Sequence, residues 1–454
     1  MDAQEQKFIR MTQAPVGKVI AKLAVPCVIS MLVTAFYNMA DTFFVGMLKS
    51  NAATAAVGVV YSMMAIIQAV GFFFGHGSGN YISRMLGQKN YKEASAMAAT
   101  GFFSALGAGV VICILGQIFL EPLAYLLGST ETILPYTKDY LRIILLGAPW
   151  MTASLVLNNQ LRFQGSAMYA MVGITIGAVL NIALDPILIF TCKMEVAGAG
   201  LATVVSQFVS FLVLLIGCSK GDNIKISLSR MRLGKTFLVQ MFRGGLPSLA
   251  RQSIASVATI CLNWATQPYS DAAIAAMGVV QRIVMFVASA MIGFGQGFQP
   301  FCGFNYGAGL YSRVKKGFTF SVKVSAIFLT VISGVVYFLA PTMIGWFRDD
   351  PDVIKFGTMA LRLQCITFPL QSWVVMSNMM QQVVGKTASA TFLAVARQGV
   401  FFIPCVLLLP LAFGALGIQM TQMVADTLTV LCAIPLQILV MRSLPKNDRL
   451  KTEN

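Results

Sequence analysis

Hydrophobic stretches of about twenty residues or more recur along the whole chain, separated by charged or turn-forming residues. Twelve of them are predicted to be helices, at residues 19–47, 54–82, 95–119, 134–156, 168–190, 198–217, 238–264, 272–301, 318–345, 353–380, 391–412 and 416–441. An α-helix needs about 20 apolar residues to cross the hydrocarbon core of a bilayer, so each stretch is long enough to span one. The pattern predicts an all-α polytopic membrane protein with twelve transmembrane helices.

The composition of the 454 residues agrees with this pattern, since 57% are hydrophobic and 11% are charged. A soluble domain carries about 25% charged residues, which excludes an ordinary soluble enzyme. The apolar surface is also too large for a disordered chain. The nine cysteines form no CxxC pair and the chain has one histidine, so we expect no metal centre and no cofactor. The polar N-terminal segment lacks a cleavable signal, so the first hydrophobic stretch is expected to direct insertion.

The net charge of +16 comes from short basic clusters between the hydrophobic stretches. Such clusters are typical of membrane topology, so we expect the lipid bilayer and no nucleic acid as a partner. The N-terminus, the even-numbered loops and the C-terminus hold 22 Lys and Arg residues, and the odd-numbered loops hold five. By the positive-inside rule, both termini are expected to be cytoplasmic in a multi-pass protein of the cell membrane.

The two halves of the chain resemble each other in one constant register. The residues that recur in this register are Gly58 and Gly278, Gly75 and Gly295, Gly77 and Gly297, Gly87 and Gly307, Arg142 and Arg362, Pro149 and Pro369, Asn158 and Asn378, and Gly165 and Gly385. We predict an N-terminal six-helix bundle at 1–218, a cytoplasmic linker at 219–243 and a C-terminal six-helix bundle with a short tail at 244–454. Six helices preserve orientation, so the bundles are predicted to be parallel repeats around a central cleft.

Three of the 17 acidic residues lie inside the predicted helices, namely Asp41, Asp185 and Asp426. A carboxylate in mid-membrane costs about 2.5–3.5 kcal/mol on insertion scales, so each one calls for an explanation. Asp41 lies eight residues before Lys49, and Asp185 lies eight residues before Lys193, both lysines marking outer helix ends. At about 1.5 Å per residue, the two carboxylates are expected at one depth, roughly 12 Å below the outer charges.

Further polar side chains are predicted at this depth. Thr203 reaches it on the sixth helix, Asn181 lies one turn from Asp185 on the same helix face, and Tyr140 lies just inside the fourth helix. Oxygen-bearing side chains of this kind suit a proton or Na⁺ as coupling ion, with Na⁺ expected at Asp41, Asn181 and Asp185. The alternative is that each polar group only hydrogen-bonds a neighbouring helix.

Asp426 has two competing interpretations. Arg282 enters its helix from the outer side to a similar depth, whereas Arg397 enters from the cytoplasm and is expected to stop about 12 Å short. Depth therefore favours a structural pair of Asp426 with Arg282. The alternative is that Asp426 faces the cleft and attracts cationic substrate.

Flexible methionine and aromatic side chains are candidates for a pliable substrate surface in the cleft. The candidates are Phe36, Met63, Met64, Met285 and Met291, together with Asp426. The single histidine, His76, is expected to be packed or hydrogen-bonded and not to relay protons. Arg251, Arg282 and Arg397 are basic residues within the predicted helices, which suits the binding of an anionic group such as a pyrophosphate.

Several motifs match one transporter family in order along the whole chain. They are YNMADTFFVG on the first helix, LNNQLRFQG at the end of the fourth, NIALDP on the fifth and ARQGVFFIPCVLLLP on the eleventh. The chain resembles the MATE family of multidrug exporters, in its bacterial MepA/DinF-like branch. The resemblance implies a secondary antiporter that exports amphipathic, often cationic drugs in exchange for H⁺ or Na⁺.

In that family, a cation-coupling network in the N-terminal half is formed by residues that match Asp41, Tyr140, Asn158, Asn181, Asp185 and Thr203. The NorM-like branch instead relies on acidic residues of the seventh and tenth helices, and those helices hold none here. The resemblance therefore implies coupling in the N-terminal half, with the bend of the first helix near Pro26 responding to the ion. We expect a monomer, no enzymatic activity, and a lipid-linked precursor flippase of the same superfamily as the alternative.

Overall fold

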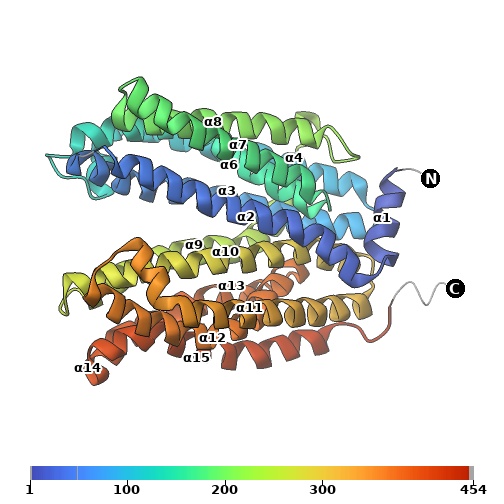
Figure 1. The fold of residues 1–454 in the computed structure, drawn as a ribbon. Coiled ribbons are helices and arrows are strands. Elements are labelled where there is room, and N and C mark those ends of the chain that lie inside the picture. The colour runs from blue at the N-terminus through green and yellow to red at the C-terminus, as the bar shows by residue number, and fades with distance from the viewer. Residues whose placement is uncertain (1–2, 49, 449–454) are drawn as a thin grey trace.

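The computed structural model describes residues 3–48 and 50–448, and within them the fold is built from long helices (Figure 1). The N-terminal half holds α1 (Ala3–Gln13), α2 (Val16–Gly46), α3 (Asn51–Gly87), α4 (Tyr91–Ile118), α5 (Leu120–Leu126), α6 (Leu134–Phe163), α7 (Ala167–Pro186), the π-helical η1 (Ile187–Thr191) and α8 (Glu195–Cys218). After the short η2 (Leu228–Arg230) come α9 (Lys235–Thr266), α10 (Asp271–Gly307), α11 (Tyr311–Phe347), α12 (Pro351–Val384), α13 (Thr387–Val395), the π-helical η3 (Ala396–Val400), α14 (Phe402–Phe413) and α15 (Ala415–Ser443).

Ten helical segments of the described residues are long and apolar enough to cross a membrane. The segments α7–η1 and α13–η3–α14 each count as one, and α9 and α12 are equally long but more polar. The all-α class is confirmed, and the count of twelve long helices agrees with the prediction. Several helices begin earlier than predicted, as α11 does at Tyr311, because their polar first turns lie outside the hydrophobic stretch. Lys49, used above to set depth, lies outside the described residues.

The two halves of the chain pack against each other through their first two long helices. Figure 1 shows the helices of the N-terminal half, blue to green, beside those of the C-terminal half, yellow to red. The main contacts between them join α2 to α10 and α3 to α9. Each half therefore places its first two helices against those of the other half, as expected for two parallel repeats.

Glycines allow the close approach at these crossings. A side chain on Gly77 of α3 would clash with the carbonyl oxygen of Met241 on α9, and one on Gly297 of α10 would clash with the backbone of Ala24 on α2. Small residues of this kind let membrane helices approach until their backbones touch. Gly77 and Gly297 occupy equivalent positions in the two repeats, so both helix crossings depend on a glycine.

Gly77→Ala is expected to destabilise the protein by about 1–3 kcal/mol, because the added methyl group meets backbone that cannot rotate away. Thermal unfolding in detergent measures the effect. The matched control is Gly58→Ala on the same helix, since a methyl group at Gly58 meets nothing within 4 Å. Equal stability of the two variants would contradict the crossing as described.

The repeat extends to individual hydrogen bonds. The amide of Asn158 donates to the carbonyl oxygen of Ala170 at 3.1 Å, and the amide of Asn378 donates to that of Ala390. The two asparagines occupy equivalent positions in the repeat, and so do the two alanines that accept their hydrogen bonds. Each bond ties the fourth long helix of its half to the fifth, so the repeated asparagines hold equivalent helix pairs together.

The N-terminal helix α1 lies across one end of the seam between the halves (Figure 1). On the N-terminal side, the Lys7 ammonium donates to Ser166 Oγ at 2.9 Å and to Asn223 Oδ1 at 3.1 Å. On the C-terminal side, Asn305 of α10 donates to the carbonyl oxygen of Met11 at 3.1 Å. The helix is thus bound to both halves at once.

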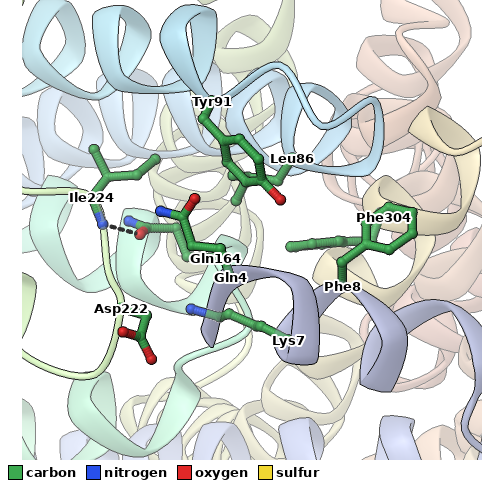
Figure 2. Close-up of a pocket in the computed structure, with 9 residues that line it drawn as sticks. All are labelled: Gln4, Lys7, Phe8, Leu86, Tyr91, Gln164, Asp222, Ile224 and Phe304. Carbon is green, nitrogen blue, oxygen red and sulfur yellow. Dashed lines mark hydrogen bonds between the residues drawn. The ribbon is translucent and has the colours of Figure 1, made fainter. Parts of the chain in front are cut away.

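A small cavity of about 20 Å³ lies beside α1 (Figure 2). It is lined by Gln4, Lys7, Phe8, Leu86, Tyr91, Gln164, Asp222, Ile224 and Phe304. This volume suits about one water molecule and excludes a drug-sized substrate. Burial, with repulsion from Arg10 as a second cause, lowers the pKa of Lys7 to about 8. The cavity is therefore part of the closed seam and not a binding site for substrate.

Candidate functional site

Polar side chains on α2 and α7 face each other in the N-terminal half, where the two helices pack together. Asp41 lies on α2, one turn beyond Tyr37, whose ring is buried. Asp185 is fully buried on α7, and Asp41 is among the charges that act on it. The structure therefore places the two predicted carboxylates close enough for their charges to interact.

Asn181 connects this pair to α8. With its amide nitrogen turned towards Asp185, Asn181 donates to Asp185 Oδ2 at 3.2 Å and accepts from the backbone N–H of Thr203 at 3.3 Å. This orientation satisfies both polar atoms of the amide, whereas the opposite one donates to Thr203 Oγ1 at 3.4 Å. Asn181 and Thr203 are 1% exposed, so this bridge between the helices is shielded from solvent.

Each carboxylate of the pair keeps one buried oxygen without a hydrogen-bond partner, namely Oδ1 of Asp41 and Oδ1 of Asp185. Leaving a buried acceptor unsatisfied is costly, and a proton or a cation removes that cost. Oxygen atoms of carboxylate, amide and hydroxyl groups are the ligands that hard cations prefer. The residues present fit a proton or Na⁺. The described residues contain no group of three or more His, Cys, Asp or Glu side chains that would suit a heavier metal.

Tyr140 belongs to the same neighbourhood and Asn158 does not. The Tyr140 ring is fully buried, its hydroxyl points to Met64 Sδ at 3.9 Å, and Thr203 is a hydrogen-bonding neighbour. Asn158 lies near the other end of α6 and uses its amide on Ala170. Eleven residues of α7 separate Ala170 from Asn181, which is about 16 Å of helix. The structure therefore separates Asn158 from the carboxylate pair.

Two residues of this cluster were missed in the sequence. Tyr37 lies near Asp41, and Gln207 hydrogen-bonds the Tyr37 hydroxyl from α8. Each lies one helical turn from a predicted site residue, Tyr37 before Asp41 and Gln207 after Thr203. A search for polar side chains at i±4 would have found both.

The prediction that Asp426 pairs with Arg282 is wrong. Asp426 Oδ1 accepts from Arg397 Nε at 2.8 Å, and these two residues form the only ion pair of Asp426 among the described residues. Helix α13 begins at Thr387, four residues before the predicted start, so Arg397 lies deeper than expected. The π-helical turn η3 also displaces the backbone at Arg397 from a regular helix.

The candidate cleft residues divide into two groups. Phe36 on α2 is 59% exposed and Met285 on α10 is 50% exposed, and the Phe36 ring meets Phe286 edge-on at 5.1 Å. Met63, Met64 and Met291 are buried in the hydrophobic core. In this conformation only the first group offers an accessible apolar surface, at the seam of α2 and α10.

Comparison with known proteins identifies the family. The MatE family model matches the chain twice, at residues 26–187 and 247–408. The chain belongs to the MatE family. The two matches fall one in each half, in agreement with the internal repeat.

Relatives of this MatE protein cover almost its whole length. It is 28% identical over 432 residues to the multidrug export protein MepA of Staphylococcus saprophyticus, with 95% of each chain covered. It is 27% identical over 434 residues to MepA of Staphylococcus aureus, again with 95% of each chain covered. Among solved structures, MATE in the straight conformation matches with a TM-score of 0.91 and 24% identity, covering 97% of this chain and 99% of the other. A MOP superfamily transporter from Pyrococcus furiosus matches with a TM-score of 0.90 and 24% identity, covering 97% of this chain and 99% of the other.

His76 of this MatE protein is buried and hydrogen-bonded, as predicted. Its Nδ1 lies 3.2 Å from the carbonyl oxygen of Phe72, and its Nε2 lies 3.4 Å from a guanidinium nitrogen of Arg162. Arg162 also donates to Gln296 of α10 at 2.6 Å. The histidine therefore helps to orient an arginine that joins the two halves.

Proposed function

We propose that this protein is a secondary antiporter that exports amphipathic, often cationic compounds from the cell in exchange for H⁺ or Na⁺. Family membership makes the chain a membrane transporter and not an enzyme, and the names of its MepA relatives support multidrug compounds as cargo. The observation that carries the coupling is the pair Asp41 and Asp185, each with one buried oxygen that has no hydrogen-bond partner. We propose that Asn181, Thr203 and Tyr140 complete this coupling site.

Ion occupancy can act on the seam between the halves through α2. A proton or Na⁺ changes the charge and hydrogen bonding of Asp41, which lies on the same helix as Pro26. Proline removes a backbone hydrogen bond and makes a helix easier to bend. The segment around Pro26 packs against α10, where a side chain on Gly293 would lie 2.7 Å from Cα of Val28. A bend there changes the contact between the halves and supports alternating access.

The test uses the full chain in sealed proteoliposomes. Efflux of a cationic dye is measured under an imposed H⁺ gradient and, separately, under an imposed Na⁺ gradient. Export driven by one of them supports antiport and names the ion. Equal dye movement with and without gradients would contradict the proposal.

We further propose that the end of the molecule holding α1 is cytoplasmic, with both termini on that side, and that the halves divide at residues 219–243. The basic residues counted above support this orientation. A single cysteine placed next to Asp222, in a cysteine-free background, is expected to be shielded from impermeant thiol reagents in intact cells. A single cysteine next to Asp350, at the other end of the molecule, is expected to be labelled. The reverse labelling pattern would overturn the orientation.

The structure gives less support to a lipid-linked precursor flippase. Of the three arginines that suggested it, Arg397 is paired with Asp426, and Arg251 donates to Asn378 at 3.3 Å. A pyrophosphate site needs several free cationic groups in one place. Drug antiport is therefore the function that the site supports best.

A further inference from the structure

A second cavity, of about 630 Å³, lies in the C-terminal half at the end of the molecule opposite to α1 (Figure 1). It is formed by the start of α10, one face of α12 and Gln419 of α15. Sites for small molecules in proteins measure about 300–1,000 Å³, so the volume suits a ligand. Its lining residues Asp352, Lys355 and Met359 are exposed. The cavity is therefore open to the surroundings of the protein and large enough to hold a molecule.

The charged residues that line this cavity all belong to α12. Asp352, Lys355 and Arg362 are spaced by three and seven residues, which places them on one face of the helix. At about 1.5 Å per residue, Asp352 lies about 4.5 Å nearer the helix start than Lys355, and Arg362 lies about 10 Å farther along. The cavity thus carries a negative group near the end of the molecule and two positive groups deeper in the membrane.

These charges are available to a ligand. Asp352 and Lys355 lie one turn apart, yet neither forms an ion pair within the part of the chain that the structure describes. Arg362 donates from Nε to the carbonyl oxygen of Tyr337 on α11 at 3.2 Å, and its guanidinium lies over the Tyr337 ring. The guanidinium is held in place, while its terminal nitrogens make no hydrogen bond to the described residues. Thr358 also lines the cavity, and its buried hydroxyl has no hydrogen-bond partner there.

The internal repeat does not account for this set of charges. Arg142 of the N-terminal half is equivalent to Arg362, but Thr132 and Pro135 occupy the positions equivalent to the carboxylate and the ammonium. The combination of the three charged groups therefore belongs to the C-terminal half alone.

Exposed tryptophans mark this end of the molecule as a boundary between membrane and water. Trp264 lies in the last turn of α9 and Trp346 in the last turn of α11, and both side chains are exposed. Tryptophan is enriched at the level of the lipid headgroups. Helix α11 packs against α12, which carries the charged face of the cavity. Lipid headgroups are thus expected beside the opening of the cavity.

We propose that this cavity binds the headgroup of a zwitterionic phospholipid, with the phosphate between Lys355 and Arg362 and the ammonium beside Asp352. Lysine and arginine form charge-assisted hydrogen bonds with phosphate oxygens. In such a lipid the phosphate lies nearer the hydrocarbon and the ammonium nearer the water, which is the order of the charges along α12. Phe356 and Met359 line the same cavity and offer an apolar surface to the start of an acyl chain. This inference is independent of the coupling ion and of the exported compound.

The test measures binding of single lipid molecules to the purified full chain by native mass spectrometry from detergent. Three lipids with identical acyl chains are compared. Phosphatidylethanolamine carries both charges, phosphatidylglycerol carries only the phosphate, and diacylglycerol carries neither. One molecule of phosphatidylethanolamine is expected to bind more tightly than either of the other two lipids, because it alone supplies a partner for every charged group of the cavity.

Variants of α12 assign the two charges of the headgroup. The double variant Lys355→Gln/Arg362→Gln loses the contacts to the phosphate and is expected to bind phosphatidylethanolamine about tenfold more weakly. Asp352→Asn is expected to weaken phosphatidylethanolamine without weakening phosphatidylglycerol, so the preference between the two lipids is lost. The matched control is Arg142→Gln, at the equivalent position of the N-terminal half, which is expected to leave lipid binding unchanged. Thermal unfolding in detergent checks that each variant is folded.

The inference is overturned if the double variant binds phosphatidylethanolamine as tightly as the unmodified protein, or if Arg142→Gln weakens it to the same extent. Equally tight binding of diacylglycerol would also reject it, since only apolar contact would then hold the lipid. Soluble glycerophosphoethanolamine identifies the source of the headgroup. If it displaces the lipid at equal concentration, the cavity takes a soluble phosphate compound, and the proposal of a lipid site is wrong.

Discussion

Asp41→Asn and Asp185→Asn are each expected to reduce ion-driven dye efflux to the level of protein-free liposomes. Asparagine keeps the size of the side chain, but it cannot take up a proton or offer a charged oxygen to Na⁺. The unpartnered Oδ1 atoms that mark the pair then lose their negative charge. Efflux from proteoliposomes under an imposed gradient measures the effect, at equal amounts of inserted protein.

The control for these variants is Asp139→Asn. Asp139 lies next to Tyr140 on α6, but its side chain is exposed and belongs to no cluster. Its replacement is expected to leave efflux and dye binding unchanged, whereas the two site variants keep dye binding and lose efflux. Gradient-driven export by either Asp41→Asn or Asp185→Asn at the normal rate would remove the pair from the coupling site.

Removal of one partner of the Arg397–Asp426 pair is expected to destabilise the protein by about 3–5 kcal/mol, because the other charge remains inside the helix bundle without its counter-charge. Removal of both partners together is expected to cost less than either single change. A double-mutant cycle of Arg397→Gln and Asp426→Asn, read by unfolding in detergent, gives the coupling energy.

The chain offers a matched exposed pair for comparison. Lys138 and Glu121 lie 2.9 Å apart, with 34% and 53% of their side chains exposed. Exposed pairs contribute about 0–1 kcal/mol, so this second cycle is expected to be close to additive. Additive losses in the Arg397–Asp426 cycle as well would show that the buried pair does not hold the C-terminal half together.

The sequence was sufficient to predict features that depend on local pattern. Apolar stretches of membrane-spanning length predicted the twelve helices, and glycines in one register predicted the repeat. Asp41 and Asp185 were placed at one depth because both lie in helices whose rise per residue is constant. The same reasoning failed for Arg397, since depth counted from an apolar boundary ignores the polar first turn of α13 and the π-turn of η3.

Helix-to-helix contacts were harder to predict. Met63, Met64 and Met291 were candidates for an accessible surface, but they are buried because neighbouring helices cover that face. Asn158 matched the family motif in type, and its contact with Ala170 depends on how closely α7 approaches α6. Hydrophobic periodicity does not contain this information, since lipid and a neighbouring helix are both apolar surroundings.

The contacts of α1 have a consequence for the order in which the chain can assemble. The segment 3–14 is synthesised before the C-terminal half, yet Met11 is bound by Asn305 and Ala14 by Arg313, both of which belong to that half. These contacts cannot form until α10 and the start of α11 have been made. A polar helix of eleven residues cannot span the bilayer, and it is too short to be stable alone in water. Helix α1 therefore takes its final place after α10 and the start of α11 have been made, and it closes the contact between the halves only when both are present.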